Sequence, residues 1–150
     1  MSNADFILGL IAGEGCFYVE LNKNKRVSHN VYARPAFTLG VKVDDPDIVH
    51  ILEEEFGFGE IVKKDNSIEI RVRNKDSIEQ LIDWLDEKSS TLFERTDKHR
   101  QYEDWKTIRN KIENCETEQD MIEIVTLSKS LSNSTHGKSK EDWHDLIRQG

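Results

Sequence analysis

The fold is decided by the stretch GLIAGEG at residues 9–15. Gly9 and Gly13 lie four residues apart, so on a helix they share one face, where the missing side chains let another helix approach at backbone distance. A glycine inside a helix costs ~1 kcal/mol relative to alanine, so two of them indicate that the close approach has a use. Glu14 stands at the C-terminal end of this helix, where the helix dipole opposes a carboxylate by ~0.3 to 1 kcal/mol. We therefore expect a compensating cation beside Glu14, which a divalent metal ion would supply; a tightly packed helix that ends in a solvated glutamate fits the spacing equally well.

Working outward, the sequence predicts alternating helices and strands. The first helix is expected over residues 6–13, capped by Asn3 or Asp5 and ended by Gly15 in the left-handed conformation. Period-two alternation of apolar and polar residues predicts strands at residues 16–22, 31–43, 60–64 and 67–73. Helical spacing predicts further helices at residues 46–56, 76–85, 98–114, 117–127 and 143–147. Pro35 marks an edge or a bulge of the second strand, and Asp44-Asp45-Pro46 is expected to cap the second helix.

This order predicts an α+β fold, in which helices cover one face of an antiparallel sheet and leave the other face open. A chain of 150 residues is expected to form one domain over residues 1–150. Its core is expected at about residues 4–115 and a helical extension at about 116–150.

The charge distribution bears on the open sheet face. A net charge of −8 taken alone argues against a nucleic-acid partner. Between residues 16 and 43, however, five basic residues stand against the single acidic Glu20, and residues 59–73 add four basic and three acidic residues. Such a net-basic ribbon can lie in a DNA groove, although a solvated face of mixed charge is the alternative. The residues expected to contact DNA are Tyr18, Glu20, Asn22, Lys23, Lys25, Arg26, His29, Tyr32, Arg34, Thr38, Lys42, Lys63, Lys64, Arg71 and Arg73.

The cysteine content and the N-terminal apolar run bear on the compartment. Cys16 and Cys115 are the only cysteines, so the chain can build neither a disulfide framework nor a four-cysteine zinc site. The apolar run at residues 6–11 is too short for a signal or membrane helix, and no basic residues precede it. We expect a soluble intracellular protein, in the cytoplasm of a prokaryote or in an organelle.

Residues 7–15 resemble the nine-residue signature of the LAGLIDADG homing endonucleases. Glu14 stands at the catalytic acidic position of that signature, while Ala12 replaces its first aspartate and Gly13 replaces its alanine. Further landmarks extend the resemblance over roughly residues 5–130: the strand at residues 35–39, the junction at residues 56–61, Leu92, Lys98 and the helix with Tyr102 and Trp105. The residues that match the signature are Gly9, Leu10, Ile11 and Gly15.

The resemblance implies an αββαββα fold whose sheet forms a DNA-binding saddle, with extra C-terminal helices. Because the chain carries one signature, it implies a homodimer that cuts both strands of a long pseudo-palindromic site. Each subunit would contribute one acid, with Glu14 and the backbone of Gly13 holding Mg²⁺, for which Mn²⁺ can substitute, and hydrolyse one phosphodiester per strand. The signature helices of the two subunits would meet at Ile7, Gly9, Leu10, Ala12 and Gly13.

Two lysines complete the implied catalytic set. Lys98 falls where the family often places a lysine that polarises water or stabilises developing charge, although a solvated lysine at a helix start would look the same. Val41 occupies a strand position where many members carry a water-positioning glutamine, so the adjacent Lys42 is the candidate to serve instead. Two alternatives stay open on this fold: a maturase that binds its own intron RNA, and a non-catalytic DNA-binding regulator.

Overall fold

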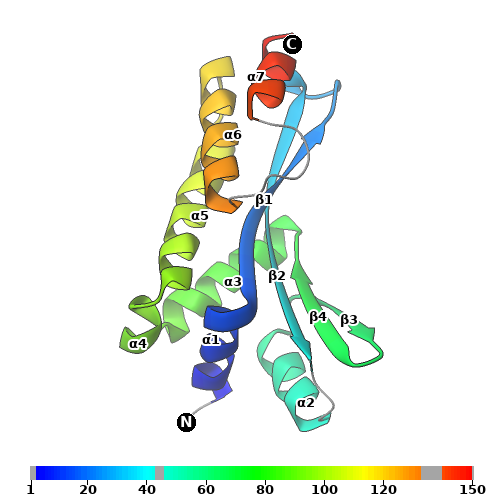
Figure 1. Cartoon of the computed structure of the whole chain (residues 1–150), viewed down its shortest axis with the longest axis vertical. Helices are drawn as coiled ribbons and strands as arrows, with labels where there is room; N and C mark the ends of the chain where they lie inside the picture. Colours follow the sequence, from blue (N-terminus) through cyan, green and yellow to red (C-terminus); the bar gives the residue numbers. More distant parts are fainter. Residues whose placement is uncertain (1–2, 43–45, 133–139, 150) are drawn as a thin grey trace. The chain divides into compact units, whose positions relative to one another are not determined.

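The computed structural model describes residues 3–42, 46–132 and 140–149 and confirms the α+β expectation. Four strands form one sheet in the order β1-β2-β4-β3. No described helix is long and apolar enough to cross a membrane. In chain order (Figure 1), the elements are α1 (Asn3–Glu14), β1 (Gly15–Lys23), η1 (Ser28–Asn30), β2 (Val31–Lys42), α2 (Pro46–Glu55), β3 (Glu60–Lys64), β4 (Ser67–Val72), α3 (Lys75–Lys88), α4 (Thr91–Glu94), α5 (Asp97–Glu113), α6 (Glu118–Ser132) and α7 (Lys140–Arg148).

The described residues form two compact units. Unit 1 comprises the described parts of Met1–Phe17 and Ala36–Arg100, and unit 2 comprises those of Tyr18–Pro35 and Gln101–Gly150. The division into a core at about residues 4–115 and a helical extension beyond it stays a prediction.

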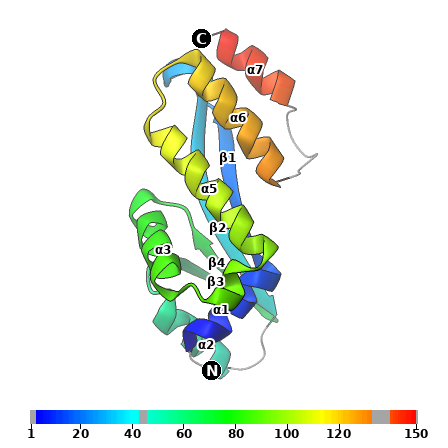
Figure 2. The same cartoon turned by 90° about the vertical axis from the view of Figure 1, so that its left-hand side faces the viewer.

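Unit 1 is built on the β3–β4 hairpin and its pairing with β2. β4 runs antiparallel to both neighbours, with Phe37 opposite Val72 and Lys42 opposite Ser67 on the β2 side. Along β4 the apolar residues are buried and the polar ones between them are only half-buried, as period two predicts. α3 lies against β4 on the buried side (Figure 2). The core of unit 1 includes Ile7, Ile11, Phe17, Phe37, Leu39, Leu52, Phe56, Ile70, Leu81 and Leu85.

Side-chain hydrogen bonds fix the helix ends around this core. Asn74 caps α3 by accepting a hydrogen bond from the Ser77 amide at 2.8 Å. The Ser77 hydroxyl donates to the Phe58 carbonyl at 2.6 Å, and Trp84 Nε1 donates to Glu55 at 3.0 Å. The turn between α2 and β3 is therefore tied to α3 at two points.

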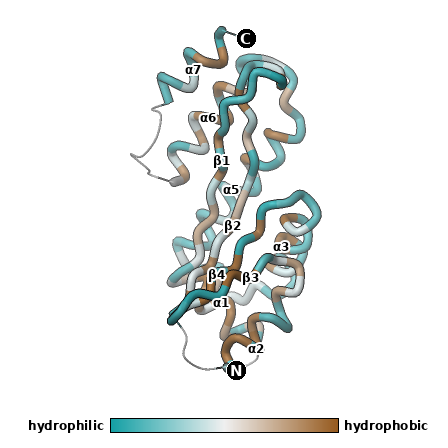
Figure 3. The backbone as a smooth tube through the Cα atoms, turned by 90° about the vertical axis from the view of Figure 1, so that its right-hand side faces the viewer, coloured by the Kyte–Doolittle hydropathy of each residue, from teal (hydrophilic) through white to brown (hydrophobic). Residues whose placement is uncertain are grey.

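Unit 2 has its own apolar core, between the outer part of the first hairpin and three helices. In Figure 3, α6 and α7 alternate between brown and teal, which is the pattern of helices with one apolar face. Trp105 Nε1 donates a hydrogen bond to the Tyr18 carbonyl at 3.0 Å and so joins α5 to β1. The buried cluster comprises Val31, Ala33, Ile108, Met121, Ile124, Val125, Trp143 and Ile147.

Several sequence-based expectations need correction. α1 begins at Asn3, so Asp5 lies in its first turn and does not cap it. Gly15 does not have the positive φ that was predicted for it. The short helices η1 and α4 were not predicted. Asp44 and Asp45 lie outside the described residues, but Pro46 is the first residue of α2 as expected.

Candidate functional site

Glu14 is the last residue of α1 and is exposed. It lines a hollow of about 620 Å³ in unit 1, whose other walls come from α1 and from the strands β2, β3 and β4. Lys42 and Val41 line the same hollow. The structure therefore brings together two of the candidate catalytic residues, Glu14 and Lys42. Because Val41 has no polar group, Lys42 is the polar side chain that this end of β2 offers. The lining residues are Leu10, Glu14, Gly40, Val41, Lys42, Lys64, Ser67, Ile68 and Glu69.

Lys98 lies at the same end of α1. Its ammonium donates a hydrogen bond to the carbonyl oxygen of Gly15, the residue after Glu14. This places a positive charge where the helix dipole is negative, although the last turn of α1 itself contains no basic residue. The compensating cation expected near Glu14 therefore comes, at least in part, from the chain itself. An ammonium has three N–H donors, so the bond to Gly15 leaves donors for a water molecule or a phosphate oxygen.

Gly15 allows the chain to leave α1 directly into β1. A Cβ at this position would lie 2.8 Å from the Ile11 carbonyl oxygen and 3.0 Å from Ile11 Cγ2. Backbone atoms cannot move aside as a side chain would. Glycine is therefore required here because the backbone of residue 15 lies so close to that of Ile11. The glycine thereby determines where Glu14 and the Gly15 carbonyl point.

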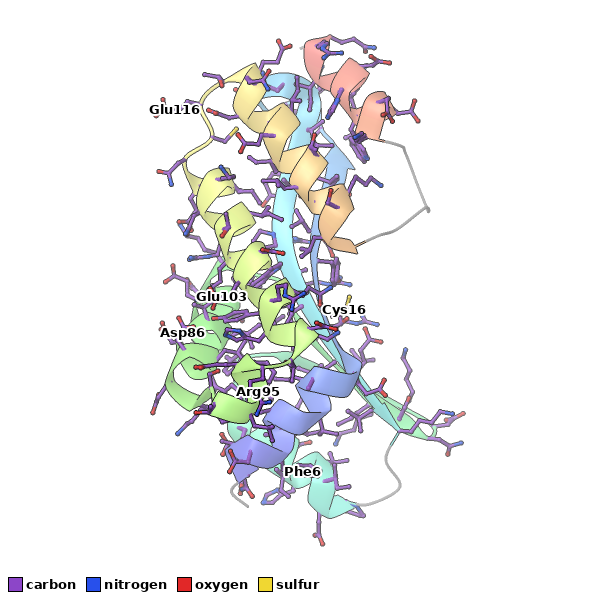
Figure 4. The ribbon with its side chains drawn as sticks, turned by 60° about the vertical axis from the view of Figure 1, so that its left-hand side comes forward. Phe6, Cys16, Asp86, Arg95, Glu103 and Glu116 are labelled. Atoms are coloured by element: carbon purple, nitrogen blue, oxygen red, sulfur yellow. The ribbon has the colours of Figure 1, made fainter. Side chains whose placement is uncertain are left out.

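A second, apolar hollow lies along α1 and shares Leu10 with the first. A Cβ added at Gly9 or at Gly13 would meet nothing within 4 Å, so this face of the helix is unobstructed. The hollow measures about 720 Å³, and Leu92 beside it is 74% exposed. Phe6 on α1 and Arg95, which follows α4, mark the two helices that border it (Figure 4). Its lining residues are Asp5, Phe6, Leu8, Gly9, Leu10, Ala12, Ser90, Leu92, Phe93 and Thr96.

One residue expected in a subunit interface is placed elsewhere. Ile7 has no exposed surface and belongs to the core of unit 1, so its side chain cannot contact a second subunit. Gly9 and Gly13 are exposed, and Leu10 and Ala12 are half-buried. The prediction is therefore corrected at Ile7, and for the other four residues it stays a prediction.

The candidate DNA-contacting residues fall into one group in each unit. In the first group, in unit 1, two of the cations bind a carboxylate outside the group: Glu69 accepts hydrogen bonds from Arg71 Nε at 2.7 Å and from Lys64 Nζ at 3.1 Å. These bonds hold the pKa of Glu69 below its usual value. The group comprises Thr38, Lys42, Lys63, Lys64, Arg71 and Arg73.

The second group, in unit 2, contains a comparable pair. Arg34 donates to Glu20 through Nε at 3.1 Å and also through Nη2. The hydrogen bond to Glu20 raises the pKa of Arg34, against an opposing effect of burial. The exposed cations of this group are Lys23, Lys25 and Arg26 at the hairpin tip. The group also includes Tyr18, Glu20, Asn22, His29, Tyr32 and Arg34.

Five residues of the Glu14 hollow were not among the sequence-based candidates, namely Gly40, Val41, Ser67, Ile68 and Glu69. The alternation of β4 already places Glu69 on the same face as Arg71. The strand register then sets Glu69 opposite Gly40 and Ser67 opposite Lys42. Alternation could have identified Glu69, whereas its proximity to Glu14 depends on a register that the sequence does not specify.

A metal ion at Glu14 would find oxygen donors only. Among the described residues, no three His, Cys, Asp or Glu side chains cluster as a metal site. The donors that are present at the end of α1 are the Glu14 carboxylate and backbone carbonyl oxygens such as that of Gly13. Hard cations such as Mg²⁺ prefer oxygen and keep several water ligands, so these donors fit part of such a coordination shell.

The comparisons with known proteins bear on the family and the fold. The family model described as LAGLIDADG endonuclease matches residues 7–109. An archaeal intron-encoded homing endonuclease, I-Vdi141I, solved in complex with DNA, has a TM-score of 0.80 at 24% identity and covers 97% of this chain and 94% of that chain. For the homing endonuclease I-TnaI, the TM-score is 0.74 at 21% identity, with 97% of this chain and 96% of that chain covered.

A longer structure is also similar. The LAGLIDADG meganuclease I-CpaMI bound to uncleaved DNA has a TM-score of 0.74 at 22% identity, covering 97% of this chain and 52% of that chain. This chain therefore spans about half the length of I-CpaMI and nearly all of the first two. Comparison with curated proteins gave no match. At these identities the likenesses establish the fold, which is the one expected from the sequence.

Proposed function

The chain belongs to the LAGLIDADG endonuclease family, and on this premise we propose that it cuts double-stranded DNA site-specifically, as a metal-dependent homodimer on a long pseudo-palindromic site. The observation that carries this proposal is the position of Glu14. The carboxylate is exposed at the end of α1, directly after Gly13 of the unobstructed glycine face, and it lines the same hollow as Lys42 of β2 and Lys64 of β3.

The surface of α1 supports a homodimer. Ile7, Leu8 and Ile11 are buried within unit 1, yet the opposite side of the helix is also apolar. A helix that is apolar all round is normally covered on both sides. The lengths of similar structures also support two copies. I-CpaMI is about twice as long as this chain, so two copies of this chain would match one copy of I-CpaMI, whereas I-Vdi141I and I-TnaI are about as long as this chain. Two copies meeting at Gly9 and Gly13 would bring their Glu14 carboxylates together.

The chemistry follows from paired carboxylates. Glu14 and the Gly13 carbonyl of each subunit would hold a divalent ion, Mg²⁺ or in its place Mn²⁺, against a phosphate of the duplex. A metal bound there would activate a water molecule and offset charge on the phosphorus. Lys98 holds the Gly15 carbonyl and keeps a positive charge at the cleavage point, while Lys42 offers a second cation from β2. Water adds to phosphorus, and one phosphodiester per strand is replaced by an alcohol and a phosphate monoester.

The basic residues of the sheet provide the DNA contacts in this proposal. I-Vdi141I and I-CpaMI were both solved with DNA. In this chain Glu20 and Glu69 each bind a neighbouring arginine, which reduces the charge of the surface but also fixes the arginine side chains. Binding should weaken steeply with salt, because phosphate contacts release counterions.

The test compares Glu14→Gln with a matched control, Glu87→Gln. Glu87 is an exposed glutamate of α3 that pairs with Lys88 at 3.5 Å. Both variants are incubated with a plasmid pool of randomised duplex sites in Mg²⁺, in Mn²⁺ and in EDTA, and the linearised fraction is sequenced. We expect cutting by the wild type and by Glu87→Gln with either metal, loss of cutting by Glu14→Gln, and loss for all proteins in EDTA.

Other outcomes select the other functions. Duplex binding with no cutting in either metal would identify a non-catalytic DNA-binding protein on this scaffold. Preference for structured intron RNA over duplex DNA would identify a maturase. Wild-type rates of cutting by Glu14→Gln would contradict the proposed mechanism.

A further inference from the structure

The tip of the first hairpin, residues 23–30, has a backbone that is neither strand nor simple turn. The Asn24 amide donates to the Asn30 carbonyl at 2.9 Å and closes the loop. Inside it, the Arg26 amide donates to Asn24 Oδ1 at 2.9 Å and the Asn30 amide to the Val27 carbonyl at 3.3 Å. This loop carries the exposed Lys23, Lys25 and Arg26, so its conformation determines where three candidate phosphate contacts lie.

Two consecutive residues of the tip adopt a left-handed backbone. His29 has φ 66° and Asn30 has φ 62°. Positive φ is uncommon for residues other than glycine, and such conformations persist where the surrounding structure holds them. The tip therefore depends on contacts from outside the loop.

Those contacts come from α7 at the end of the chain. Asn30 Nδ2 donates a hydrogen bond to the Leu146 carbonyl at 3.2 Å. Directly after the tip, Val31 packs in the buried cluster that contains Trp143 and Ile147 of α7. Figure 1 shows α7 beside the η1 end of the hairpin, which agrees with the contact between these two elements.

α7 is itself anchored from behind. His144 Nε2 lies 3.1 Å from the Thr126 hydroxyl of α6, and α6 and α7 pack on each other. The helix carries Glu141, Asp142 and Asp145 against Lys140 and Arg148, so its own charge does not favour contact with phosphate. Any effect of α7 on DNA must therefore pass through the hairpin tip.

We propose that α7 is a positioning element for DNA binding, which holds the tip in one conformation so that Lys23, Lys25 and Arg26 reach the duplex together. This inference rests on the proposed function. Holding the loop in place before binding removes the entropic cost of ordering it on the DNA. Asn30 and Trp143 are positioning residues in this arrangement, and the three cations make the contacts.

The variant Asn30→Gly isolates the link between the tip and α7. Glycine accepts the left-handed conformation, so the substitution removes the amide bond to Leu146 without straining the loop. Asn114→Gly is the matched control, because Asn114 also donates a side-chain bond to a backbone carbonyl, that of Asn110 at 2.8 Å, but this acceptor lies in α5 instead of α7. Trp143→Leu loosens the packing of α7 in the buried cluster that contains Val31. The reference is a triple alanine variant of Lys23, Lys25 and Arg26.

The measurement is the Kd for a mixed-sequence 40-base-pair duplex at several salt concentrations. A plot of log K (the association constant) against log salt has a negative slope, and each lost phosphate contact makes it less steep by about 0.9. The steepness should therefore fall by up to about 2.7 in the triple variant. We expect Asn30→Gly and Trp143→Leu to weaken binding about threefold to tenfold and to flatten the slope, while Asn114→Gly binds as the wild type does. In the triple variant, Asn30→Gly should have no further effect on the Kd, and its effect on the unfolding midpoint in urea should be the same in the triple variant as in the wild type.

Two results would overturn the positioning role while wild-type binding persists. One is an unchanged Kd and slope in both Asn30→Gly and Trp143→Leu. The other is an equal loss of affinity from Asn30→Gly in the wild type and in the triple variant, since that would show an effect on the whole protein. A wild-type protein that binds no duplex at any salt concentration would overturn the proposed function, and this inference with it.

Discussion

Lys98 donates a hydrogen bond from its ammonium to the carbonyl oxygen of Gly15, 83 residues earlier in the chain. The bond joins the first turn of α5 to the point where α1 passes into β1. It places a fixed cation next to Glu14, at the end of a helix whose dipole is unfavourable for a carboxylate. The relationship connects the stability of unit 1 with the geometry of its candidate catalytic centre.

Lys98→Met should lower both stability and cleavage. A hydrogen bond from a charged group to a carbonyl contributes about 1.5 to 3 kcal/mol, and the loss should appear as a lower free energy of unfolding in urea. Cleavage should fall by about 100-fold, the usual effect of removing a group that assists proton transfer or charge development. Lys106→Met on the same helix is the control. Cleavage by Lys98→Met that falls only in proportion to its folded fraction would assign the lysine a structural role alone.

Gly15→Ala tests the close approach between α1 and β1. The added Cβ would lie 2.8 Å from the Ile11 carbonyl oxygen, so the backbone has to shift. We expect a loss of about 1 to 3 kcal/mol in the free energy of unfolding, measured in urea, together with reduced cleavage as Glu14 moves. Gly40→Ala is the matched control, because a Cβ there meets nothing within 4 Å. Equal stability of the two variants would contradict the steric account.

Gly13→Leu tests the proposed dimer. A Cβ at this position would meet nothing within 4 Å in the chain itself, so the fold should survive. The side chain would hold two α1 helices apart, and sedimentation velocity should show a monomer where the wild type is a dimer. Gly13→Ala should weaken the dimer less. A Gly13→Leu protein that sediments as the wild type does would place the subunit contact elsewhere.

The pKa of Glu69 predicts a pH dependence of stability. Hydrogen bonds from Arg71 and Lys64 lower this pKa in the folded state, so the ionised form is favoured by folding. The contribution is present above the unfolded pKa of about 4.3 and is lost as pH falls through the folded value. Glu69→Gln should therefore be less stable than the wild type at pH 7, and the difference should shrink below about pH 4. The free energy of unfolding of both proteins is measured in urea between pH 7 and pH 3. A difference between them that stays constant over this range would contradict the prediction.

Much of the fold could be predicted from the sequence because the signals were local. The alternation of Ile68, Ile70 and Val72 with polar residues gives β4 its face, and Asp65-Asn66 forms the expected turn between β3 and β4. Pro46 begins α2 because proline suits the first position of a helix. In each of these cases the deciding interaction lies within a few residues.

The features that sequence reasoning missed depend on contacts between distant segments. Ile7 lies within the signature stretch, yet its burial depends on how α1 rotates against the core of unit 1. The hydrogen bond from Asn30 to the Leu146 carbonyl joins the hairpin tip to α7, more than a hundred residues later. Likewise, the bond from Lys98 to Gly15 requires α5 to begin beside the end of α1. Glu14, Lys42 and Lys98 were accessible to pattern recognition, whereas the bond from Lys98 to Gly15 and the hollow shared by Glu14 and Lys42 needed the fold.

The central claim is that two copies of Glu14 act in one site, and subunit mixing tests it most directly. Wild-type and Glu14→Gln chains are mixed in varied proportions in urea, refolded together, and assayed for all strand breaks, nicks included, in the site selected by the wild type. If both carboxylates are required for each cut, a mixed dimer breaks neither strand and the number of broken strands should follow the square of the wild-type fraction, so that an equal mixture keeps about a quarter. A linear decline, with half the strand breaks left in the equal mixture and nicked duplex among the products, would show that each chain cuts with its own Glu14 alone and would contradict the account.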